Sequence, residues 1–339
     1  MMKKKETKPK GIWGYLLAAF ATMCLAVASL YGGGYLNPEE KPFANAFHGE
    51  FQQYAEETFD TNHDGVFSKE ELDAVEYIAL PDLPENIRRA TWNSQWLSCF
   101  PNLTTLRCSE WGISELSVRY NPKLAVLDCS KNLITDLDLS ANPELVSVDC
   151  SKQGKVEAFD SYAPLMYEGL TNLVLGDNPK LRTLNLESND VAVLNLTGAP
   201  NLQMLNCQEN WLVLLNLSAN TMLQELNCGG NRLEELDVSN LKDLVQLQCS
   251  SNGLKTIRFA TDMNALTRID CGCNSMKELD VHGLPELSEL FCSEMFTLET
   301  LNISDCPKLM LVWCGSNPQL KISSEGCSKD IWIDIEASE

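Results

Sequence analysis

The segment Leu223–Asn231, LQELNCGGN, carries the pattern that decides the fold, L-x-x-L-x-C-x-x-N. Ten segments follow this pattern wholly or in large part, and they begin at Leu103, Leu124, Leu145, Leu181, Leu202, Leu223, Leu244, Leu266, Leu287 and Leu309. Successive starts lie 21, 21, 36, 21, 21, 21, 22, 21 and 22 residues apart. Each segment leads into a second half, such as LEELDVSNLK from Leu233. This regular period predicts a stack of similar units rather than several independent domains.

The repeated unit is a leucine-rich repeat. One coil cannot bury its own apolar face, so the leucines of neighbouring coils must stack in register to form a continuous core. We therefore expect a solenoid of parallel β coils with about ten repeats over residues 103–322, capped by residues 81–102 and 323–339. Adjacent coils should lie about 4.8 Å apart, which is the spacing of paired strands.

Asparagine occupies the ninth position of most repeats. An inward-facing amide at this point can satisfy backbone groups where the chain leaves the strand. The residues concerned are Asn132, Asn189, Asn210, Asn231, Asn252, Asn274 and Asn317, with Trp111, Gln153 and Met295 in the other three coils. We interpret this column as structural and expect the first coil and two others to be irregular.

Nine of the 14 cysteines share one inward position of the repeat, where the remaining coil has Leu186. They are Cys108, Cys129, Cys150, Cys207, Cys228, Cys249, Cys271, Cys292 and Cys314. Parallel neighbours in register point their Cβ atoms the same way, so we expect a ladder of reduced, buried thiols rather than disulfides. Cys99, Cys306 and Cys327 lie off this ladder and could pair near the ends.

The N-terminal residues are typical of a membrane-targeting segment. Five lysines fall within the basic residues 1–10, and residues 12–31 contain no charge, a length that would span about 30 Å as a helix. Within the segment assigned to 11–31, Ala26-Val27-Ala28 resembles a cleavage site, so both a retained anchor and a removed signal sequence stay open. Lysines before the segment place the chain beyond it outside the cell, at the membrane or secreted. Residues 32–47 read as a flexible linker.

Residues 48–80 contain an EF-hand pattern. The stretch DTNHDGVFSKEE, Asp60–Glu71, satisfies D-x-[DN]-x-[DN]-G-x₅-E at every specified position. Calcium prefers oxygen ligands, and the expected set is Asp60, Asn62, Asp64, Val66 through its carbonyl, Ser68 and Glu71. Helical stripes should flank the loop, the second one formed by Leu72, Val75 and Ile78. No second loop of this pattern is present, so the motif should lean on the neighbouring end of the solenoid, with weak extracellular affinity.

Two places are candidates for partner binding. If the first half of each coil forms the concave strand, its outward row ends in Phe291 and Trp313, with Leu311 beside them, and exposed aromatic clusters are where binding hot spots concentrate. Alternatively, the C-terminal cap from Ile331 covers these side chains. The coil from Leu145 also carries a 15-residue insertion at 155–169, which holds Phe159, Tyr162, Met166 and Tyr167. Insertions in repeats often lie on a binding face, but these residues could instead pack on one another.

Other classes of function lack support in the sequence. A net charge of −21 repels phosphate backbones, which argues against nucleic-acid binding. No hydrolase, metalloprotease, nucleotide-binding or dinucleotide-binding motif is present, so we do not expect an enzyme.

The targeting segment, the single EF-hand loop and the repeats together resemble bacterial cell-surface leucine-rich-repeat proteins, distantly similar to internalins. This resemblance implies an exported, non-enzymatic protein that binds a protein or glycan at the cell surface and holds Ca²⁺. A structural envelope spacer without a specific partner is the alternative. The resemblance names no ligand, because repeat families share a scaffold and not a partner.

Overall fold

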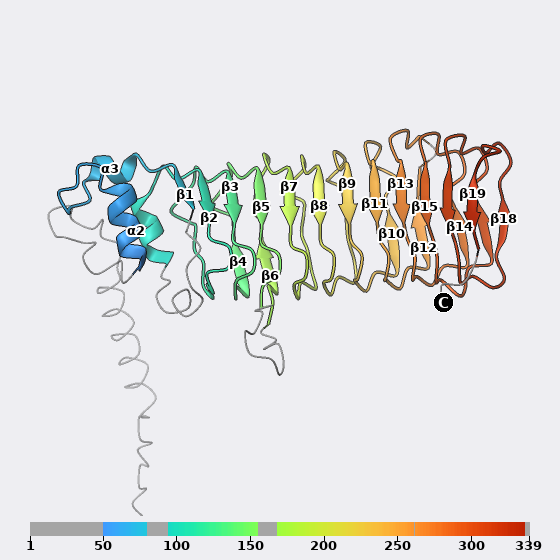
Figure 1. The fold of residues 1–339 in the computed structure, drawn as a ribbon, viewed down its shortest axis with the longest axis horizontal. Helices are drawn as coiled ribbons and strands as arrows, with labels where there is room; N and C mark the ends of the chain where they lie inside the picture. Colours follow the sequence, from blue (N-terminus) through green and yellow to red (C-terminus); the bar gives the residue numbers. More distant parts are fainter. Residues whose placement is uncertain (1–49, 80–93, 155–167, 261, 336–339) are drawn as a thin grey trace, which may run out of the picture. The chain divides into compact units, whose positions relative to one another are not determined.

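The computed structural model describes residues 50–79, 94–154, 168–260 and 262–335. His48–Glu339 forms one compact unit, separate from Met1–Phe47. Its main element is a sheet of twelve parallel strands, one from each successive coil (Figure 1). In order across the sheet these are β1 Tyr77–Ala79, β2 Thr105–Arg107, β3 Val126–Asp128, β5 Ser147–Asp149, β7 Thr183–Asn185, β8 Met204–Asn206, β9 Glu225–Asn227, β11 Gln246–Gln248, β13 Arg268–Asp270, β15 Glu289–Phe291, β17 Leu311–Trp313 and β19 Trp332–Asp334. The expected solenoid of parallel coils is confirmed.

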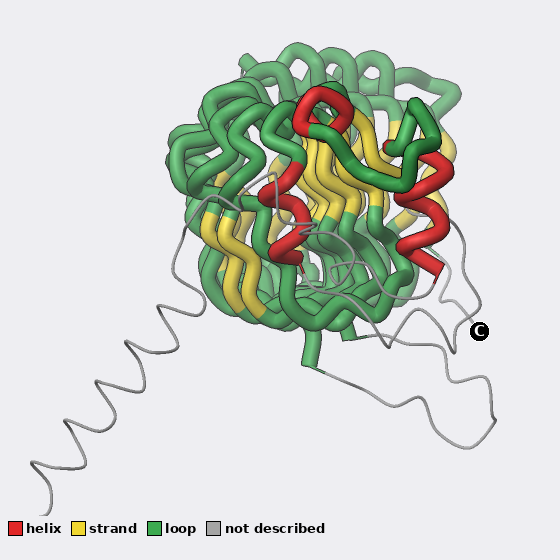
Figure 2. Tube along the Cα trace, turned by 90° about the vertical axis from the view of Figure 1, so that its left-hand side faces the viewer, coloured by secondary structure: helices red, strands yellow, loops and turns green. Residues whose placement is uncertain are grey.

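The second halves of the coils form shorter sheets on another side of the solenoid, as the view along its axis shows (Figure 2). These sheets consist of β4 Asp136–Asp138 with β6 Asn172–Val174, β10 Glu235–Asp237 with β12 Thr256–Arg258, and β14 Glu278–Asp280 with β16 Thr300–Asn302 and β18 Lys321–Ser323. Between β6 and β10, the two coils at 193–195 and 214–216 have no strand at this position.

Leucine rows and the cysteine ladder make up the core. The middle residue of each main strand from β2 to β17 is buried, as are all nine ladder cysteines. All thirteen cysteines in the described ranges are free thiols, including Cys99, Cys306 and Cys327, so no pairing forms among them. Burial raises the pKa of the Cys228 thiol to about 12, because the uncharged form is favoured away from water. The ladder therefore acts as a row of small apolar side chains.

The asparagine column ties each coil to the one before it. Asn210, for example, donates from Nδ2 to the carbonyls of Leu186 (2.9 Å) and Cys207 (3.2 Å), and its Oδ1 accepts the N–H of Val191 (3.0 Å). Gln153 makes the same kind of bonds in its own coil, through Nε2 to Cys129 and Cys150. Glutamine is thus an equivalent substitute. Trp111 and Met295 are buried apolar side chains and leave the column interrupted.

The residue before this asparagine turns the chain sharply. In all ten repeats it has a positive φ, between 53° and 64°, and only one of the ten is glycine. Residues with a side chain rarely adopt this conformation, so its recurrence marks a turn that the repeat imposes. Cys273 occupies this turn position and not the ladder position, and it is exposed while the ladder cysteines are buried.

A second asparagine column, which the sequence analysis missed, lies in the other half of the coils. Asn121, Asn142, Asn178 and Asn220 are fully buried and donate to carbonyls of the preceding coil. Counting by the repeat, Ala199 interrupts the column between Asn178 and Asn220, and beyond Asn220 the same position becomes Leu241, Met263, Leu284, Cys306 and Cys327. The column therefore changes from polar to apolar along the solenoid, which places Cys306 and Cys327 in neighbouring coils.

A short helical motif caps the N-terminal end. Helix α2, Glu50–Phe59, brings Phe59 against Phe100, with ring centroids 5.1 Å apart, and the Asn102 amide donates to the carbonyl of Asp73 (2.7 Å). The motif thus packs on the solenoid end, as expected. Between β1 and β2 lies the 3₁₀ helix η1, Ser94–Cys99.

The second helix of this motif is shorter than predicted. Helix α3 covers only Lys69–Asp73, with Ala74 as its C-cap, and Ile78 lies in strand β1. The expected helical stripe Leu72, Val75 and Ile78 was wrong because Ile78 pairs with Leu106 in the main sheet instead. The first strand of the sheet therefore falls inside the range 48–80 assigned to the EF-hand.

No helix in the described ranges is long and apolar enough to cross a membrane. The apolar segment 12–31 lies outside those ranges.

Alkylation should separate the ladder from the exposed thiol. We expect native residues 48–339 at mildly alkaline pH to take up reagent first at Cys273, because the other thiols are fully or partly buried. After unfolding without reductant, intact mass should show all thirteen thiols modified. Fewer additions after unfolding would reveal disulfides and contradict the free ladder.

Candidate functional site

The outward side of the twelve-stranded sheet, here called the sheet face, is the first candidate site. Each strand contributes its first and third residues to it, and the pairing aligns these residues into two rows. The row formed by the third residues reads Arg107, Asp128, Asp149, Asn185, Asn206, Asn227, Gln248, Asp270, Phe291 and Trp313. The outward row expected from the repeat is therefore confirmed.

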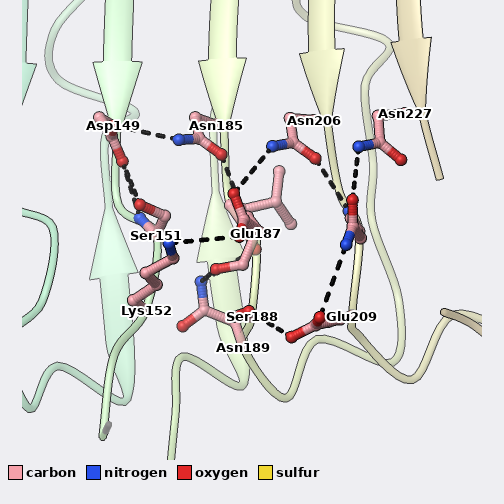
Figure 3. A network of polar contacts seen from close by, with 12 residues as sticks. Asp149, Ser151, Lys152, Asn185, Glu187, Ser188, Asn189, Asn206, Glu209 and Asn227 are labelled. Carbon is pink, nitrogen blue, oxygen red and sulfur yellow. Dashed lines mark hydrogen bonds and ion pairs between the residues drawn. The ribbon is translucent and has the colours of Figure 1, made fainter. Parts of the chain in front are cut away.

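Polar side chains fill the middle of the sheet face and bond to one another along the solenoid (Figure 3). Asn185 donates to Asp149 (3.1 Å) and Asn206 donates to Glu187 (3.2 Å). Asn227 donates to the side-chain oxygen of Gln208 (2.6 Å). These bonds fix the amides in place, over a shallow hollow of about 380 Å³ lined by β5 to β11. This middle region offers hydrogen-bond donors and acceptors rather than an apolar pocket.

The C-terminal end of the sheet face is aromatic. The Phe291 and Trp313 rings lie 6.1 Å apart, and the Arg268 guanidinium sits 4.4 Å from the centre of the Phe291 ring. Arg268 also forms an ion pair with Glu289 on the next strand. Trp313 is 45 % exposed. A cation held over an aromatic ring fixes both side chains and lowers the entropy lost when a partner binds.

The C-terminal cap extends this aromatic cluster instead of covering it. Strand β19 pairs edge to edge with β17, which places Trp332 beside Leu311 and Asp334 beside Trp313. Trp332 is 57 % exposed, and the sequence analysis did not include it as a binding residue. Its position in the alternating cap sequence Ile331–Glu336 was the signal that could have indicated it. The described part of the cap therefore leaves Phe291, Leu311 and Trp313 available to a partner. The insertion residues Phe159, Tyr162, Met166 and Tyr167 lie outside the described ranges.

The Asp60–Glu71 loop is the second candidate site. It is wound around the carboxylate of Asp60, which accepts the N–H groups of Asp64 (3.2 Å) and Gly65 (2.8 Å). Asn62 and Asp64 accept the N–H of the residue two positions later, at 2.8 Å in each case. Gly65 has φ of 76°, which makes the sharp turn possible. The side-chain oxygens predicted to bind calcium thus share one compact loop.

Glu71 is engaged differently from the other predicted ligands. Its two oxygens accept the N–H and hydroxyl of Ser68 (both 2.9 Å) and of Thr61 (2.8 and 2.9 Å), and Ser68 caps helix α3. Hydrogen bonds from the Ser68 backbone and side chain, followed by Thr61, lower the pKa of Glu71 to about 2. A lowered folded-state pKa means that this stabilisation is present above the ordinary value of 4.5 and is lost as pH falls through about 2.

This arrangement affects metal binding. In the described ranges, no three His, Cys, Asp or Glu side chains converge as a preformed metal site would require. The loop supplies hard oxygen ligands of the kind calcium prefers, but Glu71 would have to exchange its bonds to Thr61 and Ser68 for the ion.

Comparisons with known proteins bear on the fold. No known family has a sequence profile that matches this chain, and no curated protein matches it either. Among solved structures, the functional domain of InlJ from Listeria monocytogenes, which includes a cysteine ladder, is similar with a TM-score of 0.56 and 23 % identity, over 81 % of this chain and 69 % of that chain. The internalin InlF from the same species has a TM-score of 0.54 and 16 % identity, over 86 % of this chain and 98 % of that one.

A leucine-rich-repeat protein from Leptospira interrogans is also similar, with a TM-score of 0.52 and 19 % identity, over 75 % of this chain and 81 % of that chain. Likeness at these identities concerns the fold alone. The chain is a parallel β-solenoid whose structural neighbours are internalin-like leucine-rich-repeat proteins.

Proposed function

We propose that this chain is a calcium-binding leucine-rich-repeat protein, held at the outside of a cell membrane, that recognises a protein partner through its sheet face. The observation that carries this proposal is the cluster of exposed Trp313 and Trp332 with half-buried Phe291, beside a fixed row of amides and carboxylates. Apolar anchors next to ordered polar groups are the usual composition of a protein-binding hot spot and its rim. The structural neighbours support the scaffold on which this surface is built.

The charge of the sheet face narrows the kind of partner. Asp128, Asp149 and Asp270 lie in the row formed by the third residues of the strands. From β2 to β17, Arg107 is the one cation in this row. The whole chain carries −21. A partner with basic residues around an apolar anchor would complement this surface and would be steered to it at low ionic strength.

Capture tests recognition. Residues 48–339 serve as bait for cell-surface and secreted proteins, once in millimolar calcium and once with a chelator. A protein enriched in both conditions supports recognition in which the calcium loop only stabilises the fold. A protein enriched only in calcium would mean that the loop takes part in binding. Binding that survives protease but not glycosidase treatment of the target would mean a glycan ligand. No enrichment in either condition would favour the spacer.

The calcium part of the proposal rests on the loop sequence and its geometry. Asp60, Asn62, Asp64, the carbonyl of Val66, Ser68 and Glu71 would hold the ion, which would cross-link the two ends of the loop. The packing of α2 on Phe100 takes the place of a paired EF-hand as the support for the loop. A single loop in which Asn62 and Asp64 are exposed fits the weak extracellular range, with Kd of about 10⁻⁴–10⁻³ M.

Calorimetry should detect this binding. We expect residues 48–339 to bind one calcium ion, and 1 mM calcium to stabilise the fold by about 0.4–1.4 kcal/mol at this Kd, because the folded state alone binds the ion. Asp60→Ala should abolish the heat, whereas Asp73→Ala, a carboxylate just outside the loop, should keep it. No heat from the wild-type chain, or equal heat from Asp60→Ala, would rule out the site.

Membrane attachment rests on the sequence of residues 12–31 alone. We expect the full chain to sediment with membranes and to resist extraction at high pH, which removes peripheral proteins but not spanning helices. The intact mass of the mature protein then separates a retained anchor from a cleaved signal sequence. Recovery of the uncleaved chain in the soluble fraction would contradict both forms.

A further inference from the structure

A second exposed surface lies away from the sheet face, on the side formed by the second halves of the coils. It consists of Val174, Val193, Trp211, Val213 and Leu214, which we call the valine–leucine patch. Val193 is 79 % exposed and Leu214 is 70 % exposed. The patch coincides with the gap between β6 and β10. Neither the proposed function nor the fold explains why large apolar side chains are exposed here.

The patch is confined to three neighbouring coils. Counting along the 21-residue period, the position of Val193 and Leu214 is held by Asp136 and Asn172 on one side and by Glu235 and Thr256 on the other. Every other coil of this stretch therefore has a polar residue where these two have valine and leucine. A contiguous apolar surface with a polar rim is typical of a protein interface.

One edge of the patch is held rigid. The Trp211 indole N–H donates to Asp190 (2.9 Å), which also accepts the backbone N–H of Gly169 (2.6 Å). The Arg232 guanidinium lies 3.9 Å from the centre of the Trp211 ring on its other side. Because the tryptophan is fixed from two directions, its burial by a partner would cost little side-chain entropy.

We infer that the valine–leucine patch is the interface through which two copies of this chain form an antiparallel dimer. A two-fold axis between the coils of Val193 and Leu214 brings Val193 of one copy opposite Leu214 of the other. The same axis sets Asn172 opposite Glu235, an amide against a carboxylate. It also sets β4, with Asp136 and Asp138, opposite β12.

The charges on these outer strands complement each other. Strand β12 carries Arg258 and follows Lys255, whereas β4 carries two aspartates. Within its own chain Lys255 pairs with Glu234, and Arg258 lies 3.8 Å from Glu235 and 4.0 Å from Asp237, so these cations would be shared with the aspartates of the other copy. Self-complementarity of this kind is what a two-fold interface requires. The distance from β4 to β12 is five coil spacings, or about 24 Å, so a charged contact would lie at each end of the apolar patch. The sheet faces of both copies remain open to partners.

Sedimentation velocity of residues 48–339, over a range of micromolar concentrations, tests the dimer. We expect the wild-type chain to dimerise reversibly and Val193→Lys with Leu214→Lys to raise the dimer Kd at least about 100-fold, because two charges would be buried without partners. Phe296→Lys is the matched control, since Phe296 is 69 % exposed away from the patch, and it should leave the dimer unchanged.

A charge exchange tests the orientation. Lys255→Asp with Arg258→Asp should weaken the dimer about tenfold, and so should Asp136→Lys with Asp138→Lys, whereas all four substitutions together should bind more tightly than either pair alone. Recovery should be partial, because the new aspartates would also face Glu234, Glu235 and Asp237 of their own chain. In the full chain, a photo-crosslinking residue at position 214 should give a dimer on membranes. A wild-type chain that stays monomeric at all concentrations would overturn the proposal. So would a chain that dimerises only after residues 155–167 are replaced by a short glycine linker, because that segment would then be what occupies the patch.

Discussion

Replacing Asn132 with alanine should destabilise the solenoid by about 3–5 kcal/mol, which is the largest stability effect we expect from a single polar residue. Asn132 is 1 % exposed and makes five hydrogen bonds. Its Oδ1 accepts the N–H groups of Trp111 (2.9 Å) and Ile113 (3.0 Å), and its Nδ2 donates to three carbonyls. Alanine would leave these groups without partners at a buried position.

Two control variants make this result specific. Asn132→Gln should cost about 1 kcal/mol, because Gln153 already forms the equivalent bonds in the next coil. Asn185→Ala, on the sheet face, should lie within about 0.5 kcal/mol of the wild-type chain. Urea unfolding of residues 48–339, followed by circular dichroism, measures all three. If Asn132→Ala unfolds within 1 kcal/mol of Asn185→Ala, the column does not hold the coils together.

The solenoid could be predicted from sequence because its determinants recur. A buried apolar residue like Leu226 in strand β9 occurs at the same position of the neighbouring coils. Each repeat is therefore independent evidence for the same packing. The asparagine column followed from the same argument. The second column, with Asn121 and Asn220, escaped because only part of the coils has asparagine there and the rest have apolar residues or cysteine.

Features that occur once were predicted less well. Ile78 fits a helical stripe with Leu72 and Val75, and local periodicity alone cannot show that Leu106, 28 residues later, offers it a place in a sheet. The role of the C-terminal cap depended on whether β19 paired beside β17 or folded over it. The alternating sequence of the cap is compatible with either arrangement. Glu71 fits the metal-ligand pattern and the helix-capping pattern equally, since the same carboxylate serves in both.

Replacing Trp313 with alanine should weaken the binding of a captured protein partner about 30- to 700-fold, which corresponds to about 2–4 kcal/mol for a hot-spot aromatic. The ring lies beside Phe291 on the exposed end of the sheet face, so its removal takes away apolar contact area at the centre of the aromatic cluster. The fold should be little affected, because Trp313 packs on the outside of the sheet. Surface plasmon resonance with immobilised partner gives the affinity, and thermal unfolding checks the stability.

Trp211 provides a control that is matched in residue type and exposure, because both tryptophans are 45 % exposed. Both lie in a cation–π environment. Arg232 lies over the Trp211 ring, and Arg268 lies over the ring of Phe291, which is the neighbour of Trp313. Trp211→Ala should leave partner affinity within about twofold and weaken the dimer, whereas Trp313→Ala should do the reverse. Equal loss of partner binding in both variants would mean that general destabilisation, and not the sheet face, is responsible. Opposite effects of the two substitutions would separate the recognition surface from the self-association surface on one scaffold.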